Sequence, residues 1–517
     1  MSTLSLAAVL AEGARRHRGK TAVVDGDLRV SYADLWQQAL AYGAGLRELG
    51  VRRGDVVALV VPNTVEFPRA YYGALAAGAV VVPVHLLLTP AEAAYVLRDS
   101  GAKVVVCHSA LLALGAPAAA EAGIALVSVG PRPDGGAVPP RLEDVSAGVP
   151  PLRSYESTGP TDPAVILYTS GTTGEPKGAV LTHLNLVMNT VVNVFDANDA
   201  RPTDVVLGCL PLFHTFGQTV GMNGAFRLGA TLVLLARFNG AAAIDLMLRE
   251  QVDVFHGVPT MYLGLLEAAA GRTDLPKLRL CISGGAALPV AALERFSAAF
   301  DTTVYEGYGL SETSPTATTN QPHFGVRPGT VGHTVWGVET EIARPDLEDR
   351  IELLPDGELG EIVIRGHNVF AGYLNRPEAT AQAITDGWFR TGDLGTKDAD
   401  GFITIVDRKK DLIIRGGFNV YPREVEEALA RHPAIAQVSV IGVPDELHGE
   451  EICAVLVLDP ARAAPTEAEL TEWSRERLGR HKYPRRFRFV AELPMGPSLK
   501  VLKRELRRIV AQETGTA

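Results

Sequence analysis

One short stretch of the chain, YTSGTTGEPKG at residues 168–178, gathers five hydroxyl side chains, three glycines and a lysine. Glycine lets the backbone approach an anion, backbone N–H groups and hydroxyls donate hydrogen bonds to it, and the ammonium group of Lys177 adds positive charge. The composition therefore predicts a loop that binds phosphate. A plain polar surface turn uses the same residue types, so the stretch by itself leaves both interpretations open.

Two common phosphate-binding motifs do not fit this loop. The P-loop requires G-x-x-x-x-G-K-[ST], whereas Gly174 is followed here by EPKG. The chain also has no G-x-G-x-x-G after a predicted strand, so a dinucleotide-binding fold has no support. The loop must therefore act in another structural context.

Further motifs supply that context. In chain order they are GTTGEPKGAVLTH from Gly171, LPLFHTFG from Leu210, ISGGAALP from Ile282, YEGYGLSETSP from Tyr305, RTGDLG from Arg390 and DRKKD from Asp407. This set resembles the adenylate-forming superfamily, which comprises acyl-CoA synthetases, aryl-CoA ligases, luciferases and the adenylation domains of peptide synthetases. The resemblance extends over nearly the whole chain.

The resemblance implies a site for ATP and Mg²⁺. In the family the hydroxyl-rich loop closes over the β- and γ-phosphates, a glycine turn and a tyrosine contact adenine, and an aspartate and an arginine hold the ribose. The magnesium ligands that it implies are Thr172 and Glu312. The residues that it implies for ATP or AMP are Thr169, Ser170, Gly171, Thr172, Thr173, Gly174, Lys177, Gly284, Gly285, Ala286, Glu306, Gly307, Tyr308, Gly309, Ser311, Asp393 and Arg408.

The acid that reacts with ATP is a second question. His214 resembles the family residue that lines the carboxylate site, and Gly221 and Gly307 would leave room for an acyl tail. Adenylation domains that select amino acids carry an aspartate shortly after this histidine, but HTFGQT has none. The motifs are most similar to those of bacterial fatty-acyl-CoA ligases, which implies a medium- to long-chain fatty acid. A fatty-acid–acyl-carrier-protein ligase and an aryl-acid–CoA ligase remain alternatives.

The resemblance also implies a mobile C-terminal domain. Lys500, in LPMGPSLKVLKREL, matches a lysine that lies between the carboxylate and the α-phosphate, although Leu499 replaces the usual glycine before it. Rotation about a hinge at Lys410 would withdraw this lysine and bring Gly416 and Gly417 to a channel for the thiol of coenzyme A. The implied catalytic residues are Lys500, Glu312, His214 and Thr172. Leu499 also leaves open a catalytically silent relative, and a luciferase-like monooxygenase is a more distant alternative.

The elements that position these residues follow from the hydrophobic pattern. Buried strand-like runs at 55–61 and 103–107 alternate with helical patterns that begin after Ser31 and Thr89. This alternation predicts mostly parallel sheets covered by helices. Stretches from Asp55 and Asp204 both place proline seven residues later and then Gly-Ala-x-x-x-Gly-Ala before a strand. They predict two copies of one α/β layer, each with its own sheet.

The fold class expected is α/β. A large N-terminal domain, residues 1–407, would hold two α/β-layered sheets and, by resemblance, a distorted β-barrel. A small, mobile α+β domain, residues 408–517, follows a charged and then glycine-rich junction, as a hinge would. Its pattern reads helix, strand, turn and strand, and then a helix near 466–478 and a short strand near 486–490.

Composition limits the remaining possibilities. The chain has 517 residues, 47% of them hydrophobic, and a net charge of −10, which argues against nucleic-acid binding. The four cysteines form no CxxC pair and predict buried thiols in a cytoplasmic protein, and no transmembrane segment or signal peptide is expected. Partners expected are a fatty acid, ATP and CoA, with an acyl-carrier protein possible at the basic cluster Lys482, Arg485, Arg486 and Arg488. The protein is expected to be a monomer or a homodimer.

Overall fold

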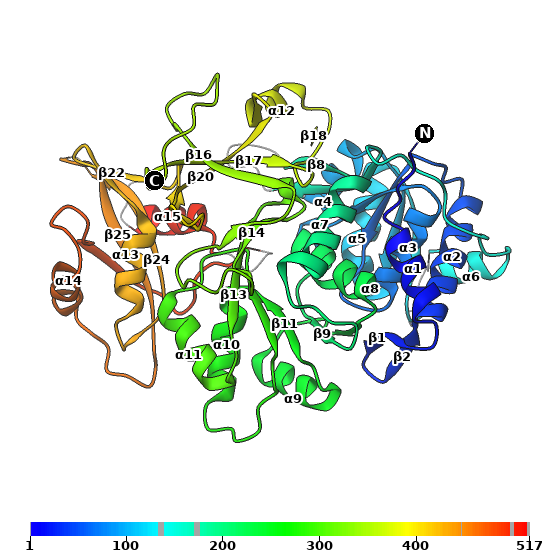
Figure 1. Cartoon of the computed structure of the whole chain (residues 1–517), viewed down its shortest axis with the longest axis horizontal. Coiled ribbons are helices and arrows are strands. Elements are labelled where there is room, and N and C mark those ends of the chain that lie inside the picture. Colours follow the sequence, from blue (N-terminus) through cyan, green and yellow to red (C-terminus); the bar gives the residue numbers. More distant parts are fainter. Residues whose placement is uncertain (1, 133–138, 170–175, 446, 497–500, 514–517) are drawn as a thin grey trace.

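The computed structural model describes residues 2–132, 139–169, 176–445, 447–496 and 501–513, and within these ranges the strands form four sheets (Figure 1). The nine-stranded sheet has, in spatial order, β15 (His333–Thr334), β14 (Thr316–Thr319), β13 (Val304–Gly309), β12 (Leu280–Ser283), β11 (Val254–Gly257), β9 (Val205–Gly208), β10 (Thr231–Leu234), β1 (Thr21–Asp25) and β2 (Leu28–Ser31). The seven-stranded sheet has β18 (Gly372–Tyr373), β8 (Lys177–Thr182), β7 (Pro163–Thr169), β4 (Val80–Pro83), β3 (Val56–Val60), β5 (Ala102–His108) and β6 (Ala125–Val129).

Two five-stranded sheets complete the set. The third sheet is antiparallel and contains β16 (Val338–Ala343), β17 (Gly360–Gly366), β20 (Trp388–Lys397), β19 (Ile384–Thr385) and β21 (Ile403–Arg408). The fourth lies in the C-terminal part and contains β23 (Phe418–Val420), β22 (Ile413–Arg415), β25 (Gly449–Leu458), β24 (Ile435–Asp445) and β26 (Arg486–Phe489). The chain thus leaves one sheet at Arg408 and enters the next at Ile413.

Helices cover these sheets. The α-helices are α1 (Ala8–Arg16), α2 (Tyr32–Glu48), α3 (Glu66–Ala76), α4 (Pro90–Asp99), α5 (Leu112–Ala122), α6 (Leu142–Ala147), α7 (His183–Val192), α8 (Gly224–Leu228), α9 (Gly240–Glu250), α10 (Pro259–Ala269), α11 (Val290–Phe300), α12 (Pro377–Ala383), α13 (Pro422–Ala430), α14 (Glu467–Arg475) and α15 (Lys503–Glu513). Two 3₁₀ turns, η1 (Ser109–Leu111) and η4 (Ser311–Thr313), and two π-helices, η2 (Asn193–Ala197) and η3 (Phe216–Asn223), join them.

The helix starts use the caps that the sequence predicts. Ser31 accepts a hydrogen bond from the backbone N–H of Asp34 at 3.1 Å, and Thr89 forms a capping box with Glu92. The central strands are buried on both faces, as parallel strands between helices must be. The two similar stretches lie in different sheets: β3 pairs with β4 in one and β9 with β10 in the other, both in parallel. The expected α/β fold class, with a smaller C-terminal domain, is confirmed.

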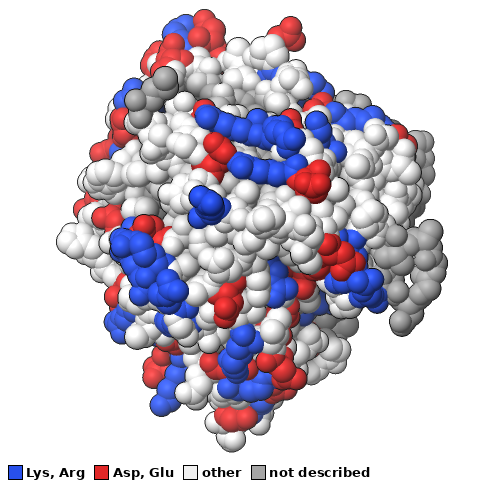
Figure 2. Space-filling view, turned by 90° about the vertical axis from the view of Figure 1, so that its right-hand side faces the viewer, with Lys and Arg blue, Asp and Glu red and all other residues white. Residues whose placement is uncertain are grey.

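The core and surface agree with the composition. All four cysteines are buried and none of them forms a disulfide. None of the described helices has the length and hydrophobicity that crossing a membrane requires. Figure 2 shows the face that lies on the right-hand side of Figure 1, where basic and acidic side chains are interspersed. Among its described residues, this face therefore presents no continuous basic surface.

Candidate active site

Several of the predicted site residues lie at the carboxyl ends of the parallel strands of the nine-stranded sheet. His214 follows β9, Gly284 and Gly285 follow β12, and Tyr308 is near the end of β13. In open α/β sheets this edge is where ligands bind, because the loops that leave the strands converge there. The third sheet adds Asp393 and Arg408 to the same place.

A buried carboxylate forms the centre of the first part of the site. Asp393 and Arg408 are register partners on β20 and β21, and Arg408 Nε lies 3.2 Å from Asp393 Oδ1. The hydroxyl of Tyr308 donates to Asp393 Oδ2 at 2.6 Å. Burial, and then the charge of Asp393, raise the pKa of Tyr308 well above its ordinary value, so the phenol stays a donor. The carboxylate keeps acceptor capacity that suits paired hydroxyl donors such as those of ribose.

The second part of the site surrounds Glu312. Its carboxylate is buried and Oε1 accepts a hydrogen bond at 2.8 Å from the hydroxyl of Tyr373 on β18. The ammonium group of Lys177 lies 5.3 Å from the centre of the same tyrosine ring. Thr169 and Lys177 are register partners at the facing ends of β7 and β8. A carboxylate and an ammonium group thus share one aromatic neighbour.

The rest of the hydroxyl-rich loop, predicted to bind phosphate, lies outside the described residues. These positions are Ser170, Gly171, Thr172, Thr173 and Gly174. The structure therefore locates the two ends of the loop, Thr169 and Lys177, and leaves the roles of the other residues as predictions.

The glycines at the strand ends are required by close backbone contacts. A Cβ on Gly284 would lie 3.2 Å from Cε1 of Phe216 and 3.4 Å from the carbonyl oxygen of Gly307. A Cβ on Gly309 would overlap the carbonyl oxygen of Pro315. Gly285 has φ +83°, a conformation that favours glycine. The neighbouring Ala286 is exposed and Ser311 begins the η4 turn.

Glu306, on β13, is a buried acid in this region. Its side chain is 4% exposed, Oε1 accepts from the backbone N–H of Leu288 at 3.3 Å, and Oε2 has no hydrogen-bond partner among the described residues. Burial raises the pKa of Glu306 to about 7, and Arg423 on α13 acts in the opposite direction. The group is therefore poised to titrate near neutrality.

His214 borders a small cavity next to the glycine turn. The cavity, of about 10 Å³, is lined by Leu210, Pro211, His214, Phe216, Gly217, Val258 and Gly285. Nδ1 of His214 accepts a hydrogen bond from the backbone N–H of Phe216 at 3.3 Å, which orients the ring at the start of η3. Of the predicted acyl-pocket residues, His214 lines this cavity, whereas Gly221 is buried in η3 and Gly307 packs behind Gly284.

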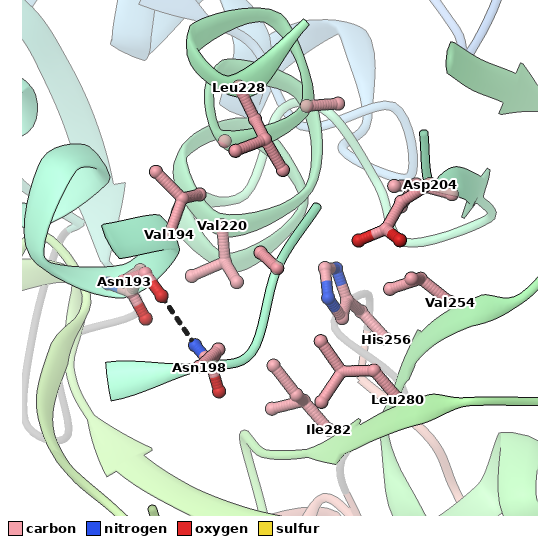
Figure 3. A pocket seen from close by; sticks show the side chains of 14 residues that line it. Asn193, Val194, Asn198, Asp204, Val220, Leu228, Val254, His256, Leu280 and Ile282 are labelled. Atoms are coloured by element: carbon pink, nitrogen blue, oxygen red, sulfur yellow. Dashed lines mark hydrogen bonds between the residues drawn. The ribbon is translucent and has the colours of Figure 1, made fainter. Parts of the chain in front are cut away.

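A second cavity, of about 30 Å³, lies under η3 and α8 (Figure 3). Its walls come from η2, α8 and the three strands β9, β11 and β12, and they are mostly apolar, with Val194, Val220, Leu228 and Ile282 among them. His256 of β11 projects into it. The two cavities are neighbours, because Phe216, which lines the smaller one, stacks on His256, which lines the larger one.

The C-terminal glycine turn joins β22 and β23. Gly416 and Gly417 both have positive φ, and the turn is exposed, as is Phe418 beside it at 59%. The predicted hinge residue Lys410 is exposed in the segment between β21 and β22. Lys500 and Leu499 lie outside the described residues.

For three side chains of the site, the sequence did not predict an individual role. Tyr373 orients Glu312 from a two-residue strand that lies 61 residues further along the chain, and nothing local marks it. Phe216 is part of LPLFHTFG, and only the fold shows that its ring packs on Gly284. His256 appears in the sequence as one polar residue in an apolar strand, VFHG, which is the one available signal.

Comparison with known proteins gives consistent matches. The family model described as AMP-binding enzyme matches residues 10–374, and its C-terminal domain model matches residues 424–500. A long-chain-fatty-acid–CoA ligase of Bacillus subtilis strain 168 is 36% identical, over 99% of this chain and 95% of its own length. A sulfoacetate–CoA ligase of Cupriavidus necator is 37% identical, over 97% of each chain. The ATP-bound crystal structure of MatB from Rhodopseudomonas palustris superposes with a TM-score of 0.89 at 35% identity, covering 98% of this chain and 99% of that one.

Proposed function

Because this chain belongs to the AMP-binding enzyme family, we propose that it adenylates a fatty acid and transfers the acyl group to the thiol of coenzyme A. The enzyme class itself is an AMP-forming acyl-CoA ligase that uses ATP and CoA as substrates. The finer assignment, to medium- or long-chain fatty acids, is the proposal.

One observation carries the proposal. The groups suited to a nucleotide, Tyr308, Asp393 and Arg408, and the group suited to a carboxylate, His214, lie at the same sheet edge. The cavity beside His214 leads toward apolar walls under η3. A site with a nucleotide end and an apolar end can hold ATP and an acid with their reacting atoms together.

The nucleotide would be positioned by side chains from both N-terminal sheets and the third sheet. We propose that the ribose hydroxyls donate to Asp393 and that Arg408 and Tyr308 keep this carboxylate oriented. The adenine ring would lie against Gly284 and Gly285 with Glu306 and Tyr308 beside it. The phosphates would meet Lys177 and the loop 170–175, whose hydroxyl and backbone N–H groups can donate hydrogen bonds.

The donor set near Glu312 suits Mg²⁺. Magnesium favours hard oxygen ligands and is bound by one or two carboxylates together with substrate phosphates and water. Glu312 supplies one such carboxylate, held by Tyr373, and Lys177 next to it attracts the phosphates that would complete the shell. Thr172 would be the second protein ligand. The ion would neutralise phosphate charge, which lowers the repulsion between ATP and the incoming carboxylate.

The chemistry then needs two displacement steps. In the first, a carboxylate oxygen attacks the α-phosphorus of ATP, the bond to the bridging oxygen breaks, and pyrophosphate leaves, so that an acyl-adenylate forms. We propose that Lys500 lies between the two anions and stabilises the charge that develops there. In the second step, the sulfur of CoA attacks the acyl carbon and AMP leaves with the electron pair of the broken bond.

Domain rotation would let one enzyme carry out both steps. The turn at Gly416 and Gly417 is bordered by Phe418 and by Leu447, whose side chain is 84% exposed. Large exposed apolar side chains beside a glycine turn are typical of a surface that docks in another state. We propose that rotation about Lys410, at the junction between residues 1–407 and 408–517, brings this turn to the thiol channel.

Pyrophosphate release tests the proposal. The purified protein would be given Mg·ATP with straight-chain fatty acids, aryl acids and amino acids. After addition of CoA or an acyl-carrier protein, the molecular mass of the thioester product would be measured. We expect acid-dependent pyrophosphate and an acyl-CoA product from fatty acids. Turnover of aryl acids alone, or of a carrier protein in place of CoA, would favour the alternative ligases. No acid-dependent pyrophosphate under any condition would contradict the assignment.

A variant of Lys500 tests the division between the steps. Lys500→Ala should lower adenylate formation by about 100-fold or more, whereas conversion of a supplied acyl-adenylate to the thioester should change little. Arg504→Ala, an exposed residue on the neighbouring helix α15, is the matched control. Equal loss of both half-reactions in the Lys500 variant would contradict the rotation.

A further inference from the structure

The two cavities at the active site lie along one line in the fold. Side chains two residues apart on a strand face the same way. Val254 and His256 of β11 line the larger cavity, and Val258, in extended conformation just after the strand, lines the smaller one next to His214. On β12, Leu280 and Ile282 pair with Val254 and His256 and line the larger cavity beside them.

The length of this line is set by the strands. Four residue steps, from Val258 back to Val254, span roughly 13 Å at ~3.3 Å per residue. Helix η3 lies over both cavities. Phe216 borders the smaller cavity, and Val220, about one turn further along the helix, borders the larger one. An acid with its carboxylate near His214 would therefore direct its tail down the line toward the second cavity.

One aromatic ring separates the two spaces. The ring of Phe216 is stacked on that of His256 with centroids 6.2 Å apart and an angle of 26°. Its other neighbour is Gly284, whose missing side chain leaves room for the ring edge. A tail that passes into the second cavity must displace Phe216 and will then meet His256 directly.

The far cavity contains two polar atoms without partners. His256 is 6% exposed, and within the described part of the chain its Nδ1 has no hydrogen-bond partner. The amide of Asn198 has a fixed orientation because Nδ2 donates to the carbonyl of Asn193 at 2.8 Å, which leaves the buried Oδ1 as an unpartnered acceptor. Buried polar atoms of this kind are costly unless a ligand or a water satisfies them.

On the basis of the proposed function, we infer that the preferred acid carries a hydroxyl group remote from its carboxylate, which hydrogen-bonds to His256 and Asn198. A hydroxyl both donates and accepts, so it can donate to Asn198 Oδ1 and accept from an imidazole N–H. A methyl end can do neither. A second carbonyl can satisfy the histidine but leaves the asparagine oxygen unpaired.

The charges around this cavity exclude an ionised tail. Asp204, which lines the cavity, forms a two-pronged ion pair with Arg279, with both Nη2–oxygen distances at 2.7 Å. Burial lowers the pKa of His256 to about 4, so the imidazole is neutral at working pH. Among the described residues that line the cavity, an ionised tail would therefore find no unpaired opposite charge, whereas a neutral hydroxyl loses less by leaving water.

Matched pairs of acids test this inference. Acid-dependent pyrophosphate release with Mg·ATP would be measured for straight-chain acids of increasing length and for the ω-hydroxy and ω-carboxy derivative of each. At the length that reaches the far cavity, we expect the hydroxy acid to have a kcat/KM about 10-fold or more above that of the plain acid. The diacid should be the poorest of the three.

Variants of the cavity identify the residues responsible. His256→Phe keeps a ring but removes the nitrogens, and it should abolish the preference for the hydroxy acid, whereas His256→Gln should retain part of it. Val254→Ala, on the same wall, changes only volume and should shift both acids together. Should His256→Phe fail to fold, the comparison of acid pairs on the wild-type enzyme still shows whether the hydroxy acid is preferred.

The outcomes separate this inference from the function on which it rests. If plain acids release pyrophosphate at least as fast as hydroxy acids at every length, the cavity holds only water and the inference is overturned, while the ligase activity stands. A hydroxyl preference that survives in His256→Phe overturns the role of His256. If no acid supports pyrophosphate release, the proposed function fails and this inference fails with it.

Discussion

Replacing Glu306 with glutamine should change how stability depends on pH. The carboxyl group of Glu306 is 4% exposed, and burial raises its pKa from 4.5 to about 7. Glutamine has nearly the shape of the protonated acid and cannot ionise. The variant therefore isolates the free energy that the folded protein loses when this group ionises.

The direction and size follow from the shift in pKa. Below pH 4.5 the acid is protonated in both folded and unfolded chains, so it does not make the free energy of unfolding depend on pH. Between pH 4.5 and about 7 the unfolded chain loses the proton first, so the wild type becomes less stable as pH rises. A shift of roughly 2.5 units corresponds to about 3 kcal/mol at 1.36 kcal/mol per unit, all of it lost above pH 7. Arg423 limits the loss and Glu427 adds to it, since both lie near the carboxyl.

Chemical denaturation of the nucleotide-free protein at several pH values measures the effect. The free energy of unfolding of Glu306→Gln minus that of the wild type should grow by about 3 kcal/mol from pH 4.5 to pH 8. Glu378→Gln, at an exposed position on α12, should give a difference that does not vary with pH. If the difference in free energy of unfolding between Glu306→Gln and the wild type stays constant over this range, Glu306 does not titrate between the two pKa values and the reasoning is refuted.

Three substitutions at the active site have separate expected outcomes. Asp393→Asn should raise the KM for ATP by about 10- to 100-fold, because it weakens the two charge-assisted hydrogen bonds to ribose that we propose, as steady-state kinetics would show. Tyr373→Phe should raise the concentration of Mg·ATP needed for half-maximal rate by about 10-fold, because Glu312 loses the hydroxyl that orients it, as a magnesium titration would show. Gly284→Ala should lower kcat/KM for the acid by about 10-fold or more, because the added methyl lies 3.2 Å from the Phe216 ring and must displace it, as acid-dependent pyrophosphate release would show.

Each of these substitutions has a matched control elsewhere in the chain. Asp356→Asn is exposed, Tyr305→Phe lies on the same strand as the site, and Gly19→Ala adds a methyl that meets nothing within 4 Å. All three should keep wild-type kinetics. If Tyr373→Phe shows an unchanged magnesium requirement, Tyr373 does not orient Glu312; if Gly284→Ala keeps its acid kinetics, the Phe216 ring is not the constraint.

Much of the fold can be predicted because local and tertiary requirements coincide. A strand buried on both faces needs a continuous apolar run, and 55–61 and 103–107 have one. Ser31 and Thr89 cap helices through hydrogen bonds to residues three positions on, so their signals are entirely local. Strand order is different: β1 pairs with β10 in the nine-stranded sheet although more than 200 residues separate them, and no local pattern contains that information.

The same difference between local and long-range information applies to the site residues. Asp393, Tyr308 and Glu312 were predicted because their motifs are contiguous in sequence. Tyr373 and His256 were not, because their roles depend on the fold: Tyr373 contacts a partner 61 residues away, and His256 lines a cavity formed by three strands and by η2, η3 and α8. Motifs record the chemistry shared by a family, whereas the far end of the acid pocket depends on packing that belongs to this chain.

The position of the two C-terminal functional segments gives a physical reason for domain movement. The Gly416–Gly417 turn and the segment that holds Lys500 belong to one small domain, and in this arrangement the turn faces solvent. Four residues, 409–412, join that domain to the third sheet, and Arg423 ties it back through the carbonyl of Ile405 at 2.6 Å. The backbone N–H of Arg423 also donates to Asp407 at 2.9 Å, and contacts of this kind stabilise one orientation only weakly where an interface between domains resembles a transient one. Under the proposed function, rotation of this one domain is sufficient to present first Lys500 and then the glycine turn to the same adenylate.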